Sequence, residues 1–254
     1  MKKIFLLFII LLINSYTLQA QQKLVFNPKI NKDSLYSTLE PIFPESQRAA
    51  YREAFHSSDE EGKEYILLVL YNAQKGGKEY LITNFETYKI QIAKLRSQYE
   101  KLNFNKYIVT TFYNESSLFL PSSHIRITIE KIKEGYLNDE ILDHGENLDL
   151  VGSYSGENEN SPEIKKALTL LKWNAETLTK MKTLIQEANV LSIRNGNPVR
   201  IEVHPNLNTM FSYKIYRENL NRQQIIEYND GCNYVYYKDN IVLYNGASEG
   251  VLCF

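Results

Sequence analysis

In the first half of the chain, apolar side chains recur with two different spacings. Between residues 86 and 102 the apolar side chains recur every three or four positions; they are Tyr88, Ile92, Leu95, Tyr99 and Leu102. This spacing predicts an amphipathic helix. In residues 124–132 the period is two, because Ile125, Ile127 and Ile129 alternate with polar residues, which predicts a strand with one buried face.

Three further segments of this half carry a local pattern. Residues 45–55 place Tyr51 and Phe55 four positions apart, which favours a helix. Residues 106–113 are rich in β-branched and aromatic side chains and predict a strand. Residues 64–72 form a continuous apolar run, and periodicity alone leaves a buried strand and a buried helix open.

The second half begins with helix starts. Ser161 followed by Pro162 predicts one start, because proline is tolerated in the first helical position, where its missing N–H needs no partner. Asn174 predicts a second start. The apolar side of that second helix consists of Leu178, Met181, Ile185 and Ala188. Residues 221–228 favour a third, shorter helix.

The pattern then changes to strands. The Asn195-Gly196 pair predicts a β-hairpin between residues 190–194 and 198–204, because Asn-Gly supplies the positive φ angles of a type I′ turn. Pro198 has no N–H to donate, which places its strand at a sheet edge.

A third strand and a last hairpin follow in residues 210–216 and 232–245, the hairpin turning at residues 239–240. The expected cross-strand pairs are Tyr237 with Val242, Tyr236 with Leu243 and Val235 with Tyr244. Helices followed by an antiparallel β-meander predict an α+β fold for the C-terminal part, after an N-terminal part of mixed helix and strand.

Composition suggests where the two parts meet. Gly, Ser, Asn, Glu and Pro dominate residues 152–163, as in a loop or linker. We therefore expect a linker at residues 151–162 between an N-terminal α+β region (21–150) and a C-terminal α+β domain (163–254). A long loop inside a single domain is the alternative.

The start of the chain has the pattern of a secretory signal peptide. Lys2 and Lys3 precede an apolar run at residues 4–13, and Ala20 supplies a small residue before the chain turns polar. A membrane anchor is the alternative, but a bilayer span needs about 20 apolar residues. We expect cleavage after residue 20 and export to the periplasm or the outside of the cell. The cleaved chain is not expected to be an integral membrane protein.

The two cysteines and the charge fit such a location. In an oxidising compartment Cys232 and Cys253 are expected to pair, with two free buried thiols or an intermolecular bridge as alternatives. The formal net charge is −1, and loss of Lys2 and Lys3 with the signal peptide changes it to −3. Nucleic-acid binding needs a basic face. Because the acidic and basic residues are nearly balanced along the chain, we expect no nucleic-acid partner.

The last third of the chain resembles an uncharacterised group of exported proteins from Bacteroidota-type bacteria. The matching features are Trp173, the stretch "SIRNGNPV", the stretch "YNDGCNYVYYKDNIVL" and the cysteine and phenylalanine at the end. The resemblance implies export and the paired cysteines. It implies no catalytic role, because no activity is attached to that group.

One segment has side chains that suggest a metal site. Residues 139–149 are crowded with acidic groups, and Asp143, His144 and Glu146 are the candidate ligands for calcium or zinc. A solvated polar loop is the alternative, since the spacing fits neither an EF-hand nor an H-E-x-x-H zinc site. The stretch "GSYSG" has Tyr154 where a serine-hydrolase elbow has its nucleophile.

Tyrosines accumulate towards the C-terminus, and Tyr213, Tyr216, Tyr234 and Tyr236 are the candidate binding residues. Tyrosine offers rigid contact area with a polar tip and is enriched in binding hot spots; ordinary cross-strand packing is the alternative. We expect an exported, non-enzymatic binding or interaction protein with an unknown protein or glycan as its ligand. The alternative is an exported hydrolase, or a divalent-cation-binding protein, that uses residues 139–149.

Overall fold

The computed structural model describes residues 26, 28–43, 45–75, 77–102, 104, 106–114, 123–134, 147–206 and 209–246. The helices in this part are α2 (Lys32–Leu39), the 3-10 helix η2 (Glu40–Ile42), α3 (Glu45–Ser57), α4 (Glu60–Lys75), α5 (Lys78–Glu100), α6 (Pro162–Leu171), α7 (Ala175–Glu187) and α8 (Arg222–Glu227). The strands are β1 (Tyr107–Asn114), β2 (His124–Ile132), β3 (Leu148–Gly156), β4 (Ser192–Arg194), β5 (Val199–Asn206), β6 (Thr209–Ile215), β7 (Tyr234–Lys238) and β8 (Ile241–Asn245).

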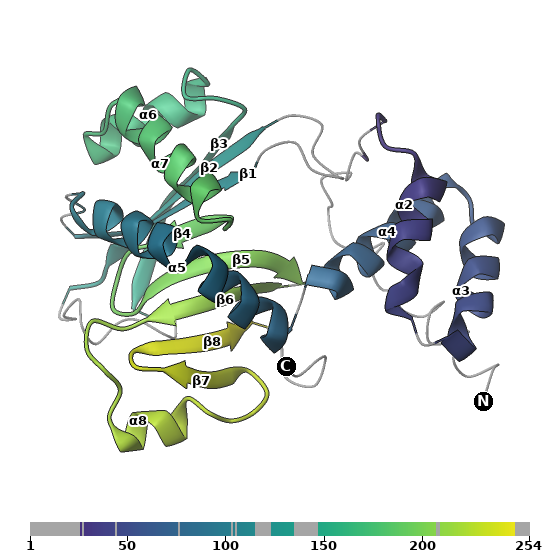
Figure 1. Cartoon of the computed structure of the whole chain (residues 1–254). Coiled ribbons are helices and arrows are strands. Elements are labelled where there is room, and N and C mark those ends of the chain that lie inside the picture. The colour runs from purple at the N-terminus through teal and green to yellow at the C-terminus, as the bar shows by residue number, and fades with distance from the viewer. Residues whose placement is uncertain are drawn as a thin grey trace.

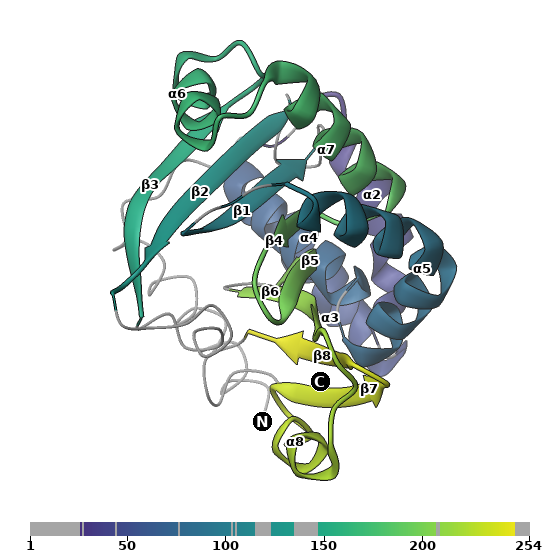
Figure 2. The same cartoon turned by 90° about the vertical axis from the view of Figure 1, so that its left-hand side faces the viewer.

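All eight strands form one antiparallel sheet in the order β3-β2-β1-β4-β5-β6-β8-β7. Helices α5, α6 and α7 lie along one face of this sheet (Figures 1 and 2). The main core lies between these helices and the sheet. There the fully buried strand residues Ile127, Ile193 and Tyr213 meet the fully buried helix residues Leu95 and Ile185. The predicted α+β class is confirmed.

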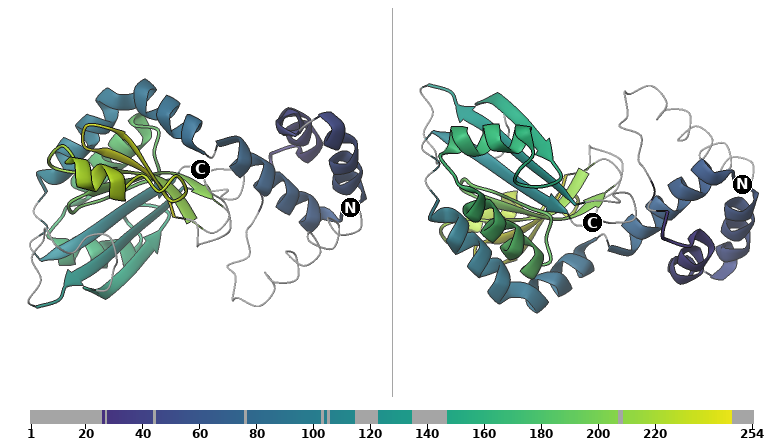
Figure 3. Two further views of the ribbon diagram at one scale, coloured as in Figure 1. Left: turned by 90° about the horizontal axis from the view of Figure 1, so that it is seen from below. Right: turned by 90° about the horizontal axis from the view of Figure 1, so that it is seen from above.

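The helices α2, α3 and α4 form a second cluster with a core of its own, centred on Phe55 and Leu67. Figure 3 shows these purple and blue helices grouped at one end of the molecule, with α4 pointing towards the sheet, and α4 contacts β5. Within this cluster Tyr36 stacks on Phe55 with ring centroids 4.2 Å apart. The undecided apolar run at residues 64–72 is therefore part of a helix, whose buried side packs on α2.

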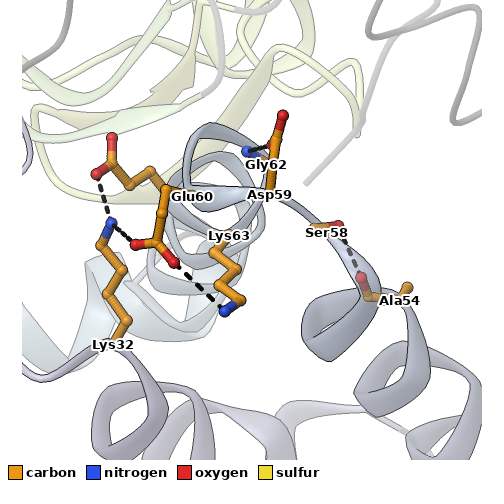
Figure 4. A network of polar contacts seen from close by, with 8 residues as sticks. Lys32, Ala54, Ser58, Asp59, Glu60, Gly62 and Lys63 are labelled. Atoms are coloured by element: carbon orange, nitrogen blue, oxygen red, sulfur yellow. Dashed lines mark hydrogen bonds and ion pairs between the residues drawn. The ribbon is translucent and has the colours of Figure 1, made fainter.

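Charged groups fasten the starts of α2 and α4 to each other (Figure 4). The Lys32 ammonium donates to Glu60 at 2.8 Å and to Glu64 at 2.6 Å. Asp59 accepts a hydrogen bond from the Gly62 amide at 2.8 Å, which caps the first turn of α4. Burial lowers the pKa of Lys32, but the hydrogen bonds to the two carboxylates outweigh it and raise the pKa overall.

The predicted helix starts of the second half are confirmed. Pro162 occupies the first turn of α6 after Ser161, and the Asn174 side chain accepts from the Thr177 amide at 2.7 Å to cap α7. Residues 86–100 lie on α5, where Ile92, Leu95 and Tyr99 are buried as the pattern predicts, and the helix ends two residues before the predicted end at residue 102. Tyr88 departs from helical backbone angles and kinks α5.

The expected linker at residues 151–162 is wrong for its first half, because residues 151–156 are the end of β3, and residues 152–156 pair with β2. The glycines there have a packing role. A Cβ on Gly156 would lie 2.4 Å from the Ser161 side chain and 3.0 Å from Ile164. The composition that suggested a linker thus reflects the close approach of β3 to the start of α6, and one sheet continues across this point.

The β4–β5 hairpin is present, but its turn is not type I′. Only Gly196 has a positive φ, because Asn195 instead extends the pairing with β1: its side chain accepts from the Val109 amide at 2.5 Å and donates to the Tyr107 carbonyl at 3.0 Å. The edge position expected from Pro198 is also wrong. Proline ends the loop, and β5 lies between β4 and β6 inside the sheet.

The last hairpin is shifted by one residue from the expected register. Val235 lies opposite Leu243 and Tyr236 opposite Val242, because a bulge between Tyr236 and Lys238 leaves Tyr237 unpaired. In this register Tyr234 lies opposite Tyr244 and Tyr236 opposite Val242, so both tyrosines lie on the sheet face away from α5–α7. Val235 and Tyr237 face the helices on the other side.

Candidate binding surface

The sheet face opposite α5–α7 carries polar and aromatic side chains, and we call it the polar sheet face. Strand alternation and register bring its members together from strands β1, β2, β4, β5, β6, β7 and β8. They are Thr110, Phe112, Arg126, Thr128, Glu130, Ser192, Arg194, Arg200, Glu202, Ser212, Lys214, Tyr234, Tyr236 and Tyr244. Towards β7 and β8 this face is covered by a small cluster that includes Leu220 and Ile225 of the α8 region.

A row of basic side chains crosses the centre of this face. Arg194 on β4 lies directly opposite Arg200 on β5, which lies directly opposite Lys214 on β6. Like charges in directly opposed positions repel, so other groups must hold this row in place. Arg194 pairs with Glu130 at 3.1 Å and Arg200 pairs with Glu202 at 3.3 Å.

Glu202 also accepts a hydrogen bond from the Ser192 hydroxyl at 2.6 Å. The carboxylate is thus shared between a hydroxyl and a guanidinium from neighbouring strands. These ion pairs are partly buried, with the side chains of Arg194 and Arg200 only 20% and 27% exposed. Screening by water is weaker at such sites than at a fully exposed pair.

Tyrosine rings surround the end of the basic row. The Lys214 ammonium lies 4.0 Å from the ring centre of Tyr244 and 4.6 Å from that of Tyr234, and the residue is only 3% exposed. The Arg200 guanidinium lies 5.1 Å from the Tyr244 ring. Cation–π attraction at these distances stabilises the charges, and the Lys214 ammonium also contacts the Tyr234 hydroxyl at 3.4 Å.

Several buried donors on this face lack a hydrogen-bond partner within the described residues. They are the Nε atoms of Arg194 and Arg200 and the hydroxyl of Ser212. A buried polar group without a partner costs about 1–3 kcal/mol. Native structures keep few such groups, and they often mark a place for a ligand, an ion or water.

A histidine lies at the margin of the same face. His124 starts β2, and its ring centre lies 6.2 Å from that of Phe112, which also contacts the Arg126 guanidinium at 5.0 Å. Burial, and then the positive charge of Arg126, lower the pKa of His124. Both effects favour the neutral imidazole.

The four candidate tyrosines divide between core and surface. Tyr213 is fully buried on the helical side, where its hydroxyl donates to the Leu81 carbonyl at 2.8 Å and accepts from Asn84 at 3.1 Å. It is a core residue, which corrects its assignment to a contact surface. Tyr216 is buried in the cluster next to α8, whereas Tyr234 and Tyr236 are partly exposed on the polar sheet face.

The candidate metal ligands Asp143, His144 and Glu146 lie outside the described residues, and so does Cys253. Cys232 is described, and its amide donates to Asp230 at 2.8 Å; its pairing with Cys253 stays a prediction. Nowhere in the described ranges do three His, Cys, Asp or Glu side chains gather as metal ligands would. Among the helices described, none combines the length and apolarity that a membrane span requires.

Sequence reasoning missed the basic row itself. The signal was present: Arg194, Arg200 and Lys214 each occupy the polar position of an alternating strand in "SIR", "VRIEV" and "MFSYKI". Alternation alone places each of them on a polar face. Only the register of three neighbouring strands shows that they are opposite one another.

Comparison of the chain with family models, curated proteins and solved structures gives no match.

Proposed function

We propose that this chain is an exported, non-enzymatic binding protein whose contact surface is the polar sheet face. The observation that carries the proposal is the row of buried and partly buried cations, with tyrosines beside it, on the sheet face opposite α5–α7. A face with only a structural role would be expected to hold solvated polar side chains or an apolar layer. Here charged groups and unpartnered donors are kept at a cost, which favours a ligand that interacts with them.

Export is part of the proposal and rests on the pattern of residues 1–20. We expect the mature protein to begin at Gln21 and to be recovered from the periplasm or the culture medium. The test is to fractionate cells of a bacterial host that expresses the full chain and to determine the N-terminal sequence of the protein in the periplasmic and medium fractions. An uncleaved chain in the cytoplasmic fraction would contradict it.

Binding is tested by blocking the face. The purified mature chain is applied to an array of envelope oligosaccharides and peptides, together with a Thr110→Trp variant. Thr110 is partly exposed and lies between Thr128 and Arg194, so an indole there obstructs the middle of the face. Thr179→Trp on the exposed side of α7 is the matched control.

We expect a ligand that binds the wild type and Thr179→Trp but not Thr110→Trp, and that mass spectrometry recovers unchanged. Equal binding by both variants, or no ligand at all, would overturn the contact surface. Conversion of the ligand would instead support the hydrolase alternative.

A further inference from the structure

We infer that two copies of this chain associate by pairing their β3 strands edge to edge in antiparallel orientation, so that the two sheets become one. The inference goes beyond the proposed function, because it concerns the edge of the sheet and not the polar sheet face. It draws on the state of the two sheet edges, the direction of the β3 backbone groups and the symmetry of their positions.

The two edges of the sheet differ in how their backbone groups are occupied. At the β7 edge, the amides of Tyr234 and Tyr236 donate to the side chains of Asp230 at 2.8 Å and Asn229 at 3.3 Å. The chain thus satisfies this edge itself. β3 forms the other edge (Figure 2), and among the described residues its backbone is hydrogen-bonded on the β2 side alone.

Hydrogen bonds of β2 show which β3 groups face outwards. The Ile132 amide donates at 3.2 Å to the carbonyl of Lys106, just before β1, and the Lys133 amide donates at 3.0 Å to the carbonyl of Asn147, just before β3. In an antiparallel ladder this direction alternates from residue to residue. The even-numbered residues of β2 therefore bond to β1, and the odd-numbered residues bond to β3.

Four residues of β3 consequently turn their backbone N–H and C=O groups away from the sheet. The residues opposite odd-numbered positions of β2 face inwards, and they are Asp149, Gly152, Tyr154 and Gly156. Val151 is the extra residue of a bulge. The outward residues are Leu148, Leu150, Ser153 and Ser155. An open row of this kind is a template for pairing with another strand.

The outward positions are symmetric about the bulge, which favours a second copy of the chain as the partner. Leu148 and Ser155 are equally distant from the centre between residues 151 and 152, and so are Leu150 and Ser153. A two-fold axis at this centre places every outward residue of one strand opposite an outward residue of the other. No other two-fold register uses all four positions, and a self-complementary patch is what a two-fold dimer requires.

The side chains at this edge fit the same register. Leu150 and Val151 are neighbouring apolar residues that are 69% and 39% exposed, and exposed apolar groups beside an open edge mark an interaction site. Leu150 would lie opposite Ser153 of the second copy, whose small side chain leaves room for it. Asp149 is the only charged residue of β3 and would lie opposite Tyr154 of the second copy, so like charges are not opposed.

Sedimentation equilibrium of the mature chain tests the inference at concentrations up to about 100 μM, where a dimer with a micromolar Kd is mostly formed. Ser153→Pro removes one outward N–H, and proline is tolerated at such an edge position. Leu150→Glu places a charge of each copy near the two-fold axis. Ile90→Glu is the control, because Ile90 is 73% exposed but lies on α5.

We expect a dimer for the wild type and Ile90→Glu, and a monomer for Leu150→Glu and Ser153→Pro. Hydrogen exchange at the four outward amides should slow as the wild-type concentration rises, because these amides gain acceptors only in the dimer. The unfolding midpoint, followed by Trp173 fluorescence, shows that each variant is folded.

The inference fails if the wild type stays monomeric over the whole concentration range. It also fails if a dimer forms that neither Leu150→Glu nor Ser153→Pro weakens, or if the four outward amides exchange as fast in the dimer as in the monomer. The array experiment with Thr110→Trp tests the polar sheet face separately.

Discussion

Replacement of Tyr213 by phenylalanine separates a core tyrosine from a contact tyrosine. Tyr213 is 0% exposed, and its hydroxyl makes two hydrogen bonds, to the Leu81 carbonyl and from the Asn84 amide. The substitution keeps the ring, which packs edge-on against Phe85 at 5.3 Å, and removes both bonds.

The expected cost follows from what the two partners retain. Leu81 lies within α5, so its carbonyl keeps its helical hydrogen bond, and the Asn84 amide keeps a long contact with the Asn189 carbonyl at 3.5 Å. Neither group is left without a hydrogen-bond partner. The loss is therefore close to the net value of two hydrogen bonds, about 2 kcal/mol, or roughly 4–8 °C in melting temperature for a chain of this size.

Urea unfolding followed by tryptophan fluorescence measures this cost, because the single tryptophan, Trp173, packs against the same core. Tyr236→Phe is the matched control. Its hydroxyl has no hydrogen bond to any described residue, so we expect a change within about 0.5 kcal/mol. Wild-type stability of Tyr213→Phe, or a larger loss in Tyr236→Phe, would refute the assignment of these two side chains.

Three further predictions concern packing, pH and the cysteines. Gly156→Ala forces a methyl group against Ser161 and should cost about 1–3 kcal/mol in urea unfolding; unchanged stability would contradict the close approach of β3 and α6. Burial raises the pKa of Tyr99 above its unfolded value of about 10, so its contribution to stability is complete below that pH and is lost as the pH rises further. Tyr99→Phe should flatten that alkaline decline in unfolding midpoint. A Cys232–Cys253 bridge predicts an intact mass lower by two hydrogens and a loss of about 3 kcal/mol on reduction; reactive free thiols in the native chain would exclude it.

Local patterns predicted most of the elements, because periodicity and caps are local properties. Ile125, Ile127 and Ile129 are all fully buried, as their alternation indicates, and Asn174 caps α7. Such features depend on a few neighbouring residues, and the sequence contains all of them.

The errors came from contacts between distant segments. Asn195 has the composition of a turn, but β1 binds its side chain and keeps its φ negative. Gly156 has the composition of a linker, but α6 packs on it. The basic row depends in the same way on the register between strands, which no single stretch of sequence encodes.

The junction of β1 with β4 has a consequence for the order in which the sheet forms. On one side of it, β1–β2–β3 pair with their neighbours in the chain, and on the other β4–β5–β6 do the same. The junction is short, with three opposed residue pairs, and the Asn195 side chain that completes it reaches Tyr107 across 88 residues of chain. Closing so large a loop costs entropy before any contact compensates for it. We therefore expect the two strand groups to form first and their seam to close late, so that the rate of folding depends on the meeting of β1 and β4.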